Sequence, residues 1–253
     1  MLTRAARSGF TFLVAATLLV GTREARAIRP FITDDARVVG AGHLQLETYW
    51  RRDRSSLQQW LLPAIGPTDW MELTLGGVHG LAQLGRPGAP VYAVGGPVLQ
   101  GKFLLRETIP NRLPGVAFSA GGLPPVGRGG FEAPGWSAFS YVAITQAFLK
   151  EDDLLIHANL GLSAVSAPGL APAKLTWGLG AQVETLYDFH LIAEVFSGNP
   201  YVRGSGGAYQ AGFRMIFNDH LQLDGTWGGG LWGDERLPVW LSSGVRIVSH
   251  ELF

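Results

Sequence analysis

The chain has 253 residues, of which 47% are hydrophobic and 16% are charged, with 20 Lys and Arg against 20 Asp and Glu. This hydrophobic content excludes a disordered chain, and a zero net charge without a run of basic residues gives no electrostatic basis for binding nucleic acid. The sequence contains no Cys, which excludes disulfide scaffolds, thiolate zinc sites and Cys nucleophiles.

The first 27 residues have the pattern of a secretory signal peptide. Arg4 and Arg7 form a basic beginning, residues 10–20 are apolar, and Ala25 and Ala27 provide small residues at the cleavage position. The alternative is an N-terminal membrane anchor, but the apolar run is shorter than the roughly 20 residues that a spanning helix needs. Cleavage removes four Arg and one Glu, so we expect an exported mature chain with a net charge of −3.

From residue 43 onward, apolar and polar residues alternate with a period of two, which is the pattern of strands with one apolar and one polar face. Leu175, Trp177 and Leu179, for example, alternate with Thr176 and other small or polar residues. Twelve strands are expected, near residues 43–52, 56–65, 70–79, 97–107, 114–123, 137–149, 153–165, 174–186, 189–198, 206–217, 220–231 and 238–252.

The connections between these strands alternate in character. Short polar turns are expected at residues 67–69, 151–153, 187–188 and 218–219. Longer connections rich in Gly and Pro are expected at residues 80–96, 124–136, 166–173, 199–206 and 232–237. An even number of strands joined by alternating short and long connections is typical of an outer-membrane barrel, whose periplasmic turns are short and whose external loops are long.

A soluble β-sandwich or jelly roll also alternates, but its strands typically have about 5–6 residues. The strands expected here have about ten, which a tilted strand needs to cross a bilayer. Aromatic residues at strand ends suit two interfacial girdles, namely Trp50, Trp60, Trp70, Trp136, Tyr187, Phe217, Trp232 and Trp240. We therefore predict an all-β fold, a transmembrane antiparallel up-and-down β-barrel of about 12 strands over residues 43–253, located in the bacterial outer membrane.

The last residue, Phe253, is expected on the periplasmic side. A terminal Phe resembles the insertion signal of bacterial outer-membrane proteins, and Val245 and Ile247 fit its alternating apolar positions, whereas Ser249 and Glu251 do not. The partners expected for the barrel are outer-membrane lipid and lipopolysaccharide, the barrel-assembly machinery during insertion, and a small-molecule solute.

Several segments resemble a known family. Residues 28–36 (IRPFITDDA) and 43–47 (HLQLE) are similar to the opening of outer-membrane proteins associated with meta-cleavage phenol degradation. Residues 66–73 (GPTDWMEL) resemble the first periplasmic turn and strand of that family, and residues 101–103 and 114–124 resemble its central pair of strands. The resemblance implies an outer-membrane barrel, described in that family as a transporter, with a link to aromatic catabolism.

Residues 28–42 precede the first strand and are too polar to face lipid, because they carry Arg29, Asp34, Asp35 and Arg37. Two interpretations remain open, a plug inside the lumen and a tail in the periplasm. Paired carboxylates also suit calcium, but the spacing of an Asp-x-Asp-x-Asp-Gly loop is missing. We expect no metal and no cofactor.

The polar faces of the strands place charged residues inside the barrel. The inward set is expected to be Glu47, Arg51, Glu72, Lys102, Arg106, His157, Glu184, Glu194, Arg214, Asp224, Arg246 and His250. One interpretation is a network of mutually paired charges, because charges in a narrow barrel must be paired or hydrated. The other is a solute path, for which we select Lys102, Arg106, Glu47, Arg51, Glu184, Arg214, Asp224 and Arg246.

Lys102 and Arg106 form the pair expected to attract a carboxylate or phenolate. Asp34 and Asp35 are expected to occupy that pair when no solute is present. Twelve strands leave a narrower lumen than the 16 to 18 strands of water-filled porins. We therefore predict a barrel that passively admits a small monoaromatic or weakly acidic solute. The alternative is a structural or surface-interaction barrel with a sealed lumen and no transport.

An enzyme is not expected. A hydrolase needs a nucleophile, a His and an orienting group within hydrogen-bond reach. The six His residues are spread over six strands, and no Gly-x-Ser-x-Gly motif occurs. His79 with Ser119 or Ser163 is the nearest approach to such a set, and nothing in the spacing supports it, so we name no catalytic residue.

Overall fold

The computed structural model describes residues 32–85, 87–150, 153–200 and 202–252. The expected signal peptide, residues 28–31 and Phe253 lie outside these ranges, so the predictions made for them are not addressed by the structure. Within the described ranges, no helix is long and apolar enough to span a membrane.

The described chain forms one antiparallel sheet. Its strands are β1 (Leu44–Asp53), β2 (Ser56–Thr68), β3 (Met71–Ala82), β4 (Val91–Arg106), β5 (Gly115–Leu123), β6 (Gly127–Arg128), β7 (Trp136–Phe148), β8 (Leu154–Ser166), β9 (Ala173–Leu186), β10 (Phe189–Ser197), β11 (Gly207–Asn218), β12 (Leu221–Trp232) and β13 (Trp240–Val248). Each long strand pairs with its neighbours in sequence, and β6 is a short addition that pairs only with β4.

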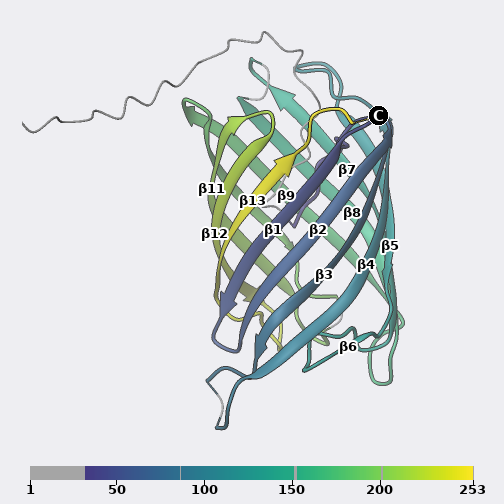
Figure 1. Ribbon diagram of the computed structural model, residues 1–253, viewed down its shortest axis with the longest axis vertical. Helices are drawn as coiled ribbons and strands as arrows, with labels where there is room; N and C mark the ends of the chain where they lie inside the picture. The colour runs from purple at the N-terminus through teal and green to yellow at the C-terminus, as the bar shows by residue number, and fades with distance from the viewer. Residues whose placement is uncertain (1–31, 86, 151–152, 201, 253) are drawn as a thin grey trace, which may run out of the picture.

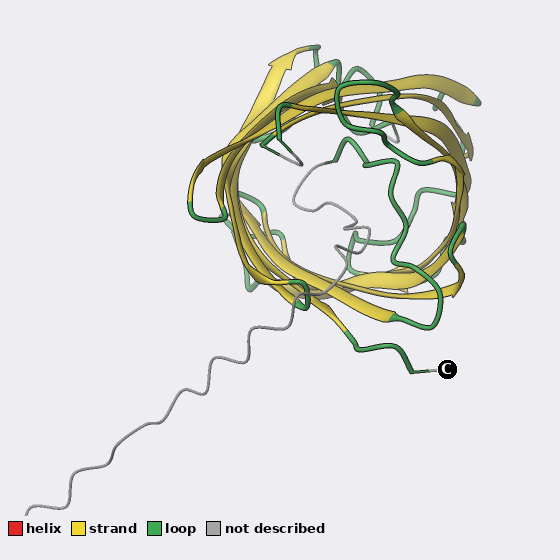
Figure 2. Ribbon diagram, turned by 90° about the horizontal axis from the view of Figure 1, so that it is seen from above, coloured by secondary structure: helices red, strands yellow, loops and turns green. Residues whose placement is uncertain are grey.

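The sheet closes on itself because β1 pairs with β13, for example at Gln45 opposite Val248. Twelve strands form the wall, β6 being excluded. Figure 1 shows the tilted strands around a single axis, and Figure 2 shows the closed ring seen along that axis. The predicted closed 12-stranded up-and-down barrel is confirmed. Closure removes the free edges that an open sheet would expose.

The strand boundaries agree with the prediction to within a few residues, with three differences. β4 begins at Val91 rather than at residue 97, because the chain before Pro97 continues the ladder with β3. The Gly-rich sequence around Gly95 predicts a loop. Pairing with β3 makes this stretch a strand instead, and the local sequence does not show that pairing. The last strand ends at Val248 rather than at residue 252, and β6 was not predicted.

The two ends of the barrel differ in their connections. The end called here the turn end carries the connections 69–70, 107–114, 149–153, 187–188 and 219–220. The end called the loop end carries the connections 54–55, 83–90, 124–135, 167–172, 198–206 and 233–239. Short turns and long loops are thus segregated, with residues 54–55 and 107–114 as the two exceptions in length.

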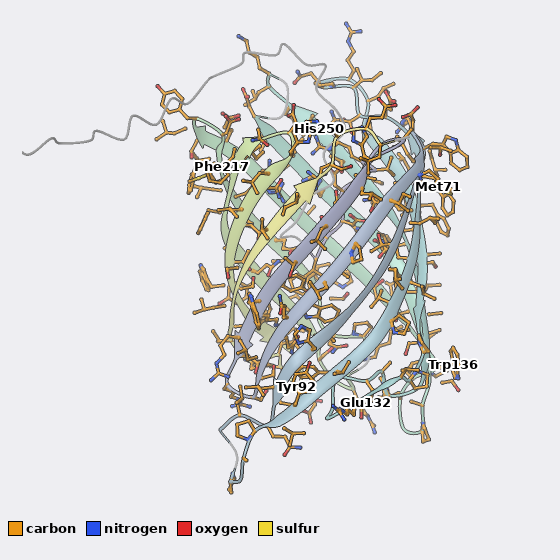
Figure 3. All side chains as sticks on the ribbon, viewed as in Figure 1. Met71, Tyr92, Glu132, Trp136, Phe217 and His250 are labelled. Carbon is orange, nitrogen blue, oxygen red and sulfur yellow. The ribbon has the colours of Figure 1, made fainter. Side chains whose placement is uncertain are left out.

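The alternation of the strands sorts side chains between the outside and the lumen, as predicted. On β9, Leu179 is 52% exposed on the outer face, whereas Gln182 is 2% exposed inside. Figure 3 shows Phe217 and Trp136 projecting outward near opposite ends of the barrel. The prediction of two aromatic girdles is wrong for Trp60 and Trp240, which face the lumen.

Candidate functional site: a lumen closed by its own chain

The chain before β1 runs inside the barrel. Residues 32–42, called here the lumen segment, contact inward side chains of β3, β4, β7 and β10, strands that lie around the ring. Val38 and Val39 are 0% and 2% exposed although the segment belongs to no strand. The segment leaves at the turn end, where the Gly42 N–H donates to the Gly66 carbonyl at 2.9 Å. It therefore fills the part of the lumen next to the turn end.

Carboxylates of the wall hold the main chain of the lumen segment. Glu194 of β10 accepts hydrogen bonds from the N–H groups of Ile32 and Thr33, at 2.6 and 2.7 Å. Glu72 of β3 accepts from the N–H of Val39 at 2.9 Å. Buried N–H groups need acceptors, and a segment without a neighbouring strand has no ladder to supply them. These glutamates replace the missing ladder, which explains carboxylates inside a narrow barrel.

Asp34 lies among donors from three strands. Its Oδ1 accepts from Lys102 Nζ of β4 at 2.8 Å, and its Oδ2 accepts from the Tyr141 hydroxyl of β7 at 2.7 Å. Gln100 Nε2 in turn donates to the Tyr141 oxygen and to Ser119 Oγ. Hydrogen bonds to an ionised carboxylate are stronger than neutral ones. A cation and a phenol thus form an anion site, which the protein's own aspartate occupies.

Asp35 is fully buried beside Asp34 but faces other partners. Its Oδ1 accepts from Thr145 Oγ1 of β7 at 2.7 Å, and its Oδ2 accepts from Arg37 Nε at 2.5 Å. Thr145 Oγ1 also accepts from the N–H of Ala36 at 3.0 Å. One hydroxyl therefore binds both the side chain and the main chain of the lumen segment.

The electrostatics of this cluster keep Asp35 ionised. Burial by itself raises the pKa of the Asp35 carboxyl. The positive charges of Arg37, His157 and Lys102, with the hydrogen bond from Thr145, outweigh burial and hold the pKa below its usual value. Both Asp34 and Asp35 have cationic or hydroxyl partners, so their carboxylates are engaged by the protein itself. No group of three metal-ligating side chains was found in the described ranges.

Other charges of the inward set pair within the wall. Arg246 Nε donates to Gln45 Oε1 at 2.7 Å and lies 3.9 Å from Glu47 Oε1. Arg214 of β11 is the direct cross-strand partner of Asp224 of β12, and both are buried. These selected residues lie in the lumen where the alternation predicts them.

The expected pairing of Lys102 with Arg106 is wrong. The pairing of β4 with β5 shifts register between Leu104 and Arg106, so the alternation does not carry to the end of the strand. Arg106 is exposed at the turn end, where its Nε donates to the Pro114 carbonyl at 2.8 Å. Of Lys102 and Arg106, it is Lys102 that contacts Asp34. The alternation of apolar and polar residues does not predict a bulge of this kind.

Two further selected residues lie near the ends of the barrel. Glu184 is half-buried at the turn end, where it accepts from the N–H of Asp188 at 3.3 Å. Arg51 lies towards the loop end with its guanidinium 4.3 Å from the centre of the Trp240 ring. This cation–π contact explains why Trp240 is buried in the lumen instead of lying in an interfacial girdle.

A cavity of about 750 Å³, called here the vestibule, opens between the lumen segment and the loop end. Ile32 and Thr33 line it from the segment, and loop residues 129–131 and 198–200 line it from the other side. Five aromatic side chains contribute to its wall, namely Trp60, Phe131, Phe139, Tyr141 and Phe196. The vestibule is therefore an aromatic chamber whose floor is the end of the lumen segment.

Two buried polar atoms of β8 in the vestibule wall, Asn159 Oδ1 and Ser163 Oγ, have no hydrogen-bond partner among the described residues. Sequence reasoning placed neither in the solute path, and it also missed Tyr141 and Thr145. All four occupy inward positions of their strands, so alternation could have found them. Choosing lumen residues by their charge leaves these four out, although the neutral hydroxyl groups of Tyr141 and Thr145 bind the lumen segment.

The fold defines a class, the closed 12-stranded antiparallel β-barrel, which solved outer-membrane proteins share. An outer membrane channel from Pseudomonas putida F1 has a TM-score of 0.64 and 12% identity, covering 85% of this chain and 98% of that chain. The KdgM porin has a TM-score of 0.56 and 10% identity, with coverage of 81% and 99%. The NanC porin has a TM-score of 0.52 and 11% identity, with coverage of 83% and 100%.

At these identities the comparison shows a shared fold. No family model matches the sequence, and the search of curated proteins found no match.

Proposed function

We propose that this chain is an outer-membrane channel that passively admits a small solute through a lumen gated by residues 28–42. The observation that supports it most is that a segment outside the wall, residues 32–42, occupies part of the lumen. Polar contacts such as that of Lys102 with Asp34 hold this segment, and polar contacts can exchange with water or with a solute. A barrel closed by wall side chains alone would have no such removable part.

The vestibule supports a monoaromatic solute with a hydroxyl or acidic group. Aromatic side chains stack on a flat ring, and five of them surround a volume suited to a small molecule. Asn159 Oδ1 and Ser163 Oγ offer acceptors for a hydroxyl hydrogen. Arg51, also in the wall, offers a positive charge for a carboxylate. An unsubstituted hydrocarbon would leave these polar groups without partners.

An anionic solute would then compete with Asp34. The carboxylate of Asp34 sits between Lys102 and the Tyr141 hydroxyl, 2.8 and 2.7 Å away. A benzoate-like carboxylate presents the same two oxygens, so it satisfies the same donors if the segment withdraws. Segment and solute thus bind in turn, which links entry of the solute to opening of the lumen.

The membrane orientation proposed follows from the connections and the outer face. The turn end faces the periplasm and the loop end faces the exterior, with lipid and lipopolysaccharide around the apolar wall. The barrel-assembly machinery is the partner proposed for insertion. Cell fractionation tests this placement: we expect an outer-membrane protein whose gel mobility shifts on heating. A soluble periplasmic protein without that shift would overturn it.

Deletion of residues 28–40 tests the gate. In planar bilayers the truncated barrel should conduct more than the full mature chain, and liposomes containing it should take up benzoate faster. The double variant Lys102→Gln and Arg106→Gln should lower the preference for anions, and Lys102→Gln alone should account for the change, because Arg106 is exposed at the rim.

The second candidate is a structural barrel with a sealed lumen. The observation in its favour is the pairing of buried charges within the wall, such as Arg246 with Glu47 and the cross-strand partners Arg214 and Asp224. If the truncated barrel folds yet conducts no more than the full chain, the wall itself closes the lumen and this candidate stands instead.

A further inference from the structure

Two histidines from different strands meet at the turn end. His220 precedes β12 and His250 follows β13, and the centres of their rings are 4.1 Å apart with the ring planes at 60°. Figure 3 shows His250 at the end of the barrel where the C-terminal part of the chain lies. His250 is exposed and His220 is half-buried. Ions in solution can therefore reach the pair, which is separate from the vestibule.

The hydrogen bond of His220 fixes the state of its ring. Its Nδ1 lies 3.0 Å from the carbonyl oxygen of Val248. A carbonyl oxygen only accepts, so Nδ1 carries the hydrogen and Nε2 presents a lone pair. A ring nitrogen bonded to a main-chain carbonyl is the usual support of a metal-binding imidazole, since it orients the ring and makes the other nitrogen more basic.

The strand pairing holds the two rings together. Leu221 is opposite Ile247 in the β12–β13 ladder, and the Val248 N–H donates to the His220 carbonyl at 2.9 Å. His250 lies two residues beyond Val248, a diagonal position within reach of long side chains. Two imidazole bonds to one metal ion, each about 2.0–2.1 Å, need nitrogens about 3 Å apart. The ring centres are 4.1 Å apart, and the exposed His250 ring can turn about its side-chain bonds towards His220 while His220 keeps its bond to Val248.

We propose that His220 and His250 bind one divalent transition-metal ion at the turn end. Imidazole nitrogen suits Cu²⁺, Ni²⁺ and Zn²⁺, and Cu²⁺ binds most tightly of these. Water completes the coordination, because the described residues place no group of three ligating side chains together. The site is therefore an exchangeable surface site rather than a closed structural one. It does not depend on whether the lumen conducts.

Cu²⁺ titration of the tag-free full mature chain, refolded in detergent micelles, tests the proposal. Calorimetry should give one high-affinity ion per barrel, and electron paramagnetic resonance should show splitting from two imidazole nitrogens. His220→Ala and His250→Ala should each weaken binding by more than about tenfold, because the second imidazole acts on an ion that the first already holds nearby.

His79→Ala is the matched control. His79 contacts Tyr92 of β4 and lies far along the strand from the turn end, so its loss should leave Cu²⁺ binding unchanged. Heat-dependent gel mobility establishes that each variant is folded. Binding that survives in both folded variants, His220→Ala and His250→Ala, would overturn the proposal. So would a spectrum with a single nitrogen, or an equal loss of binding in His79→Ala.

Discussion

Next to the turn end, the lumen is filled by chain whose charged groups meet partners, whereas next to the loop end it is a cavity of about 750 Å³ with aromatic walls. The same strands build both halves. On β7, Thr145 binds the lumen segment, while Phe139 lines the vestibule. In the filled half, the carboxylates of Asp34 and Asp35 are matched to donors of the protein's own chain. In the vestibule, by contrast, Ser163 Oγ is buried without a partner among the described residues.

This difference separates closing the lumen from recognising a solute. In the filled half, the carboxylates and main-chain N–H groups that hold the lumen segment have the hydrogen bonds expected of a folded interior, where an unpaired polar group is costly. The vestibule has the mixture of aromatic surface and isolated polar atoms expected of a ligand pocket. Substitutions in the filled half should therefore act on opening, and substitutions in the vestibule on solute preference.

Of these substitutions, Lys102→Met should have the largest effect on how often the lumen segment opens. Lys102 is 2% exposed, and removing its charge leaves Asp34 between a phenol and an apolar side chain. Losing one partner of a buried pair costs about 3 kcal/mol, at the lower end of the range because Asp34 is partly exposed. The lumen segment should therefore be open roughly 100-fold more often. Mass spectrometry of limited trypsin digests should show faster cleavage after Arg37.

Lys174→Met is the control for that substitution. Lys174 Nζ donates to the Val202 carbonyl near the loop end, away from the lumen segment. Cleavage after Arg37 should match the wild type. If both variants accelerate it equally, loss of positive charge in general, and not loss of the Asp34 contact, opens the lumen.

Gly66→Ala should open the lumen through a steric clash with the lumen segment rather than through loss of a charge. A Cβ at Gly66 of β2 would lie 1.8 Å from the carbonyl oxygen of Gly40, so main chain must move. Overpacking of this kind costs about 2 kcal/mol. Conductance and cleavage after Arg37 should both rise. A Cβ at Gly77 would lie 3.2 Å from the Gly95 carbonyl oxygen and meets no atom of the lumen segment, so Gly77→Ala is the control for crowding in the wall and should leave cleavage after Arg37 unchanged.

Asp35→Asn should have a smaller effect on closure of the lumen, and this effect should depend on pH in the acidic range. The pKa of Asp35 lies below the usual value of 3.8, so its contribution to closure is complete above that pH and falls as the pH drops through the lowered pKa. Asp35→Asn removes the charge of the carboxylate that accepts from Thr145 of the wall, and a hydrogen bond to a charged group is worth about 1.5 kcal/mol. Wild type and variant should still differ in closed fraction at pH 5, and the part of the difference that depends on ionised Asp35 should shrink only below about pH 4. A difference already lost at pH 5 would contradict the assignment.

The barrel could be read from the sequence because each strand is long and its two faces meet different surroundings. Period-two alternation placed Leu179 outside and Gln182 inside without knowledge of any neighbour. Strand order followed because consecutive strands pair in an up-and-down barrel. The start of β4 at Val91 was missed because pairing with β3 overrides a local sequence rich in Gly.

The site was harder to read, because it depends on contacts across the lumen. Alternation shows that Tyr141 and Asp34 belong to an inward face and a polar segment, but not that they meet at 2.7 Å. The register shift near Arg106 is set by the partner strand, so no pattern in its own strand reveals it. Selection by charge overvalued Arg106 and overlooked Thr145.

Ser163→Ala should have the smallest effect on the fold and a selective effect on solute. Its Oγ is buried without a partner in the described chain, so its removal should change the free energy of unfolding by no more than about 0.5 kcal/mol. If a phenolic hydroxyl binds there, losing that hydrogen bond costs about 1 kcal/mol, or roughly fivefold. Liposome uptake should therefore favour 4-hydroxybenzoate over benzoate in the wild type and lose that preference in the variant.

Thr145→Val is the matched change in the filled half. It removes a hydroxyl bonded to Asp35 and to the N–H of Ala36, and it should instead raise uptake of both solutes alike. Solute-selective loss in Ser163→Ala and general gain in Thr145→Val would establish that the two halves act separately, whereas a shared pattern would show that one continuous path both closes and selects.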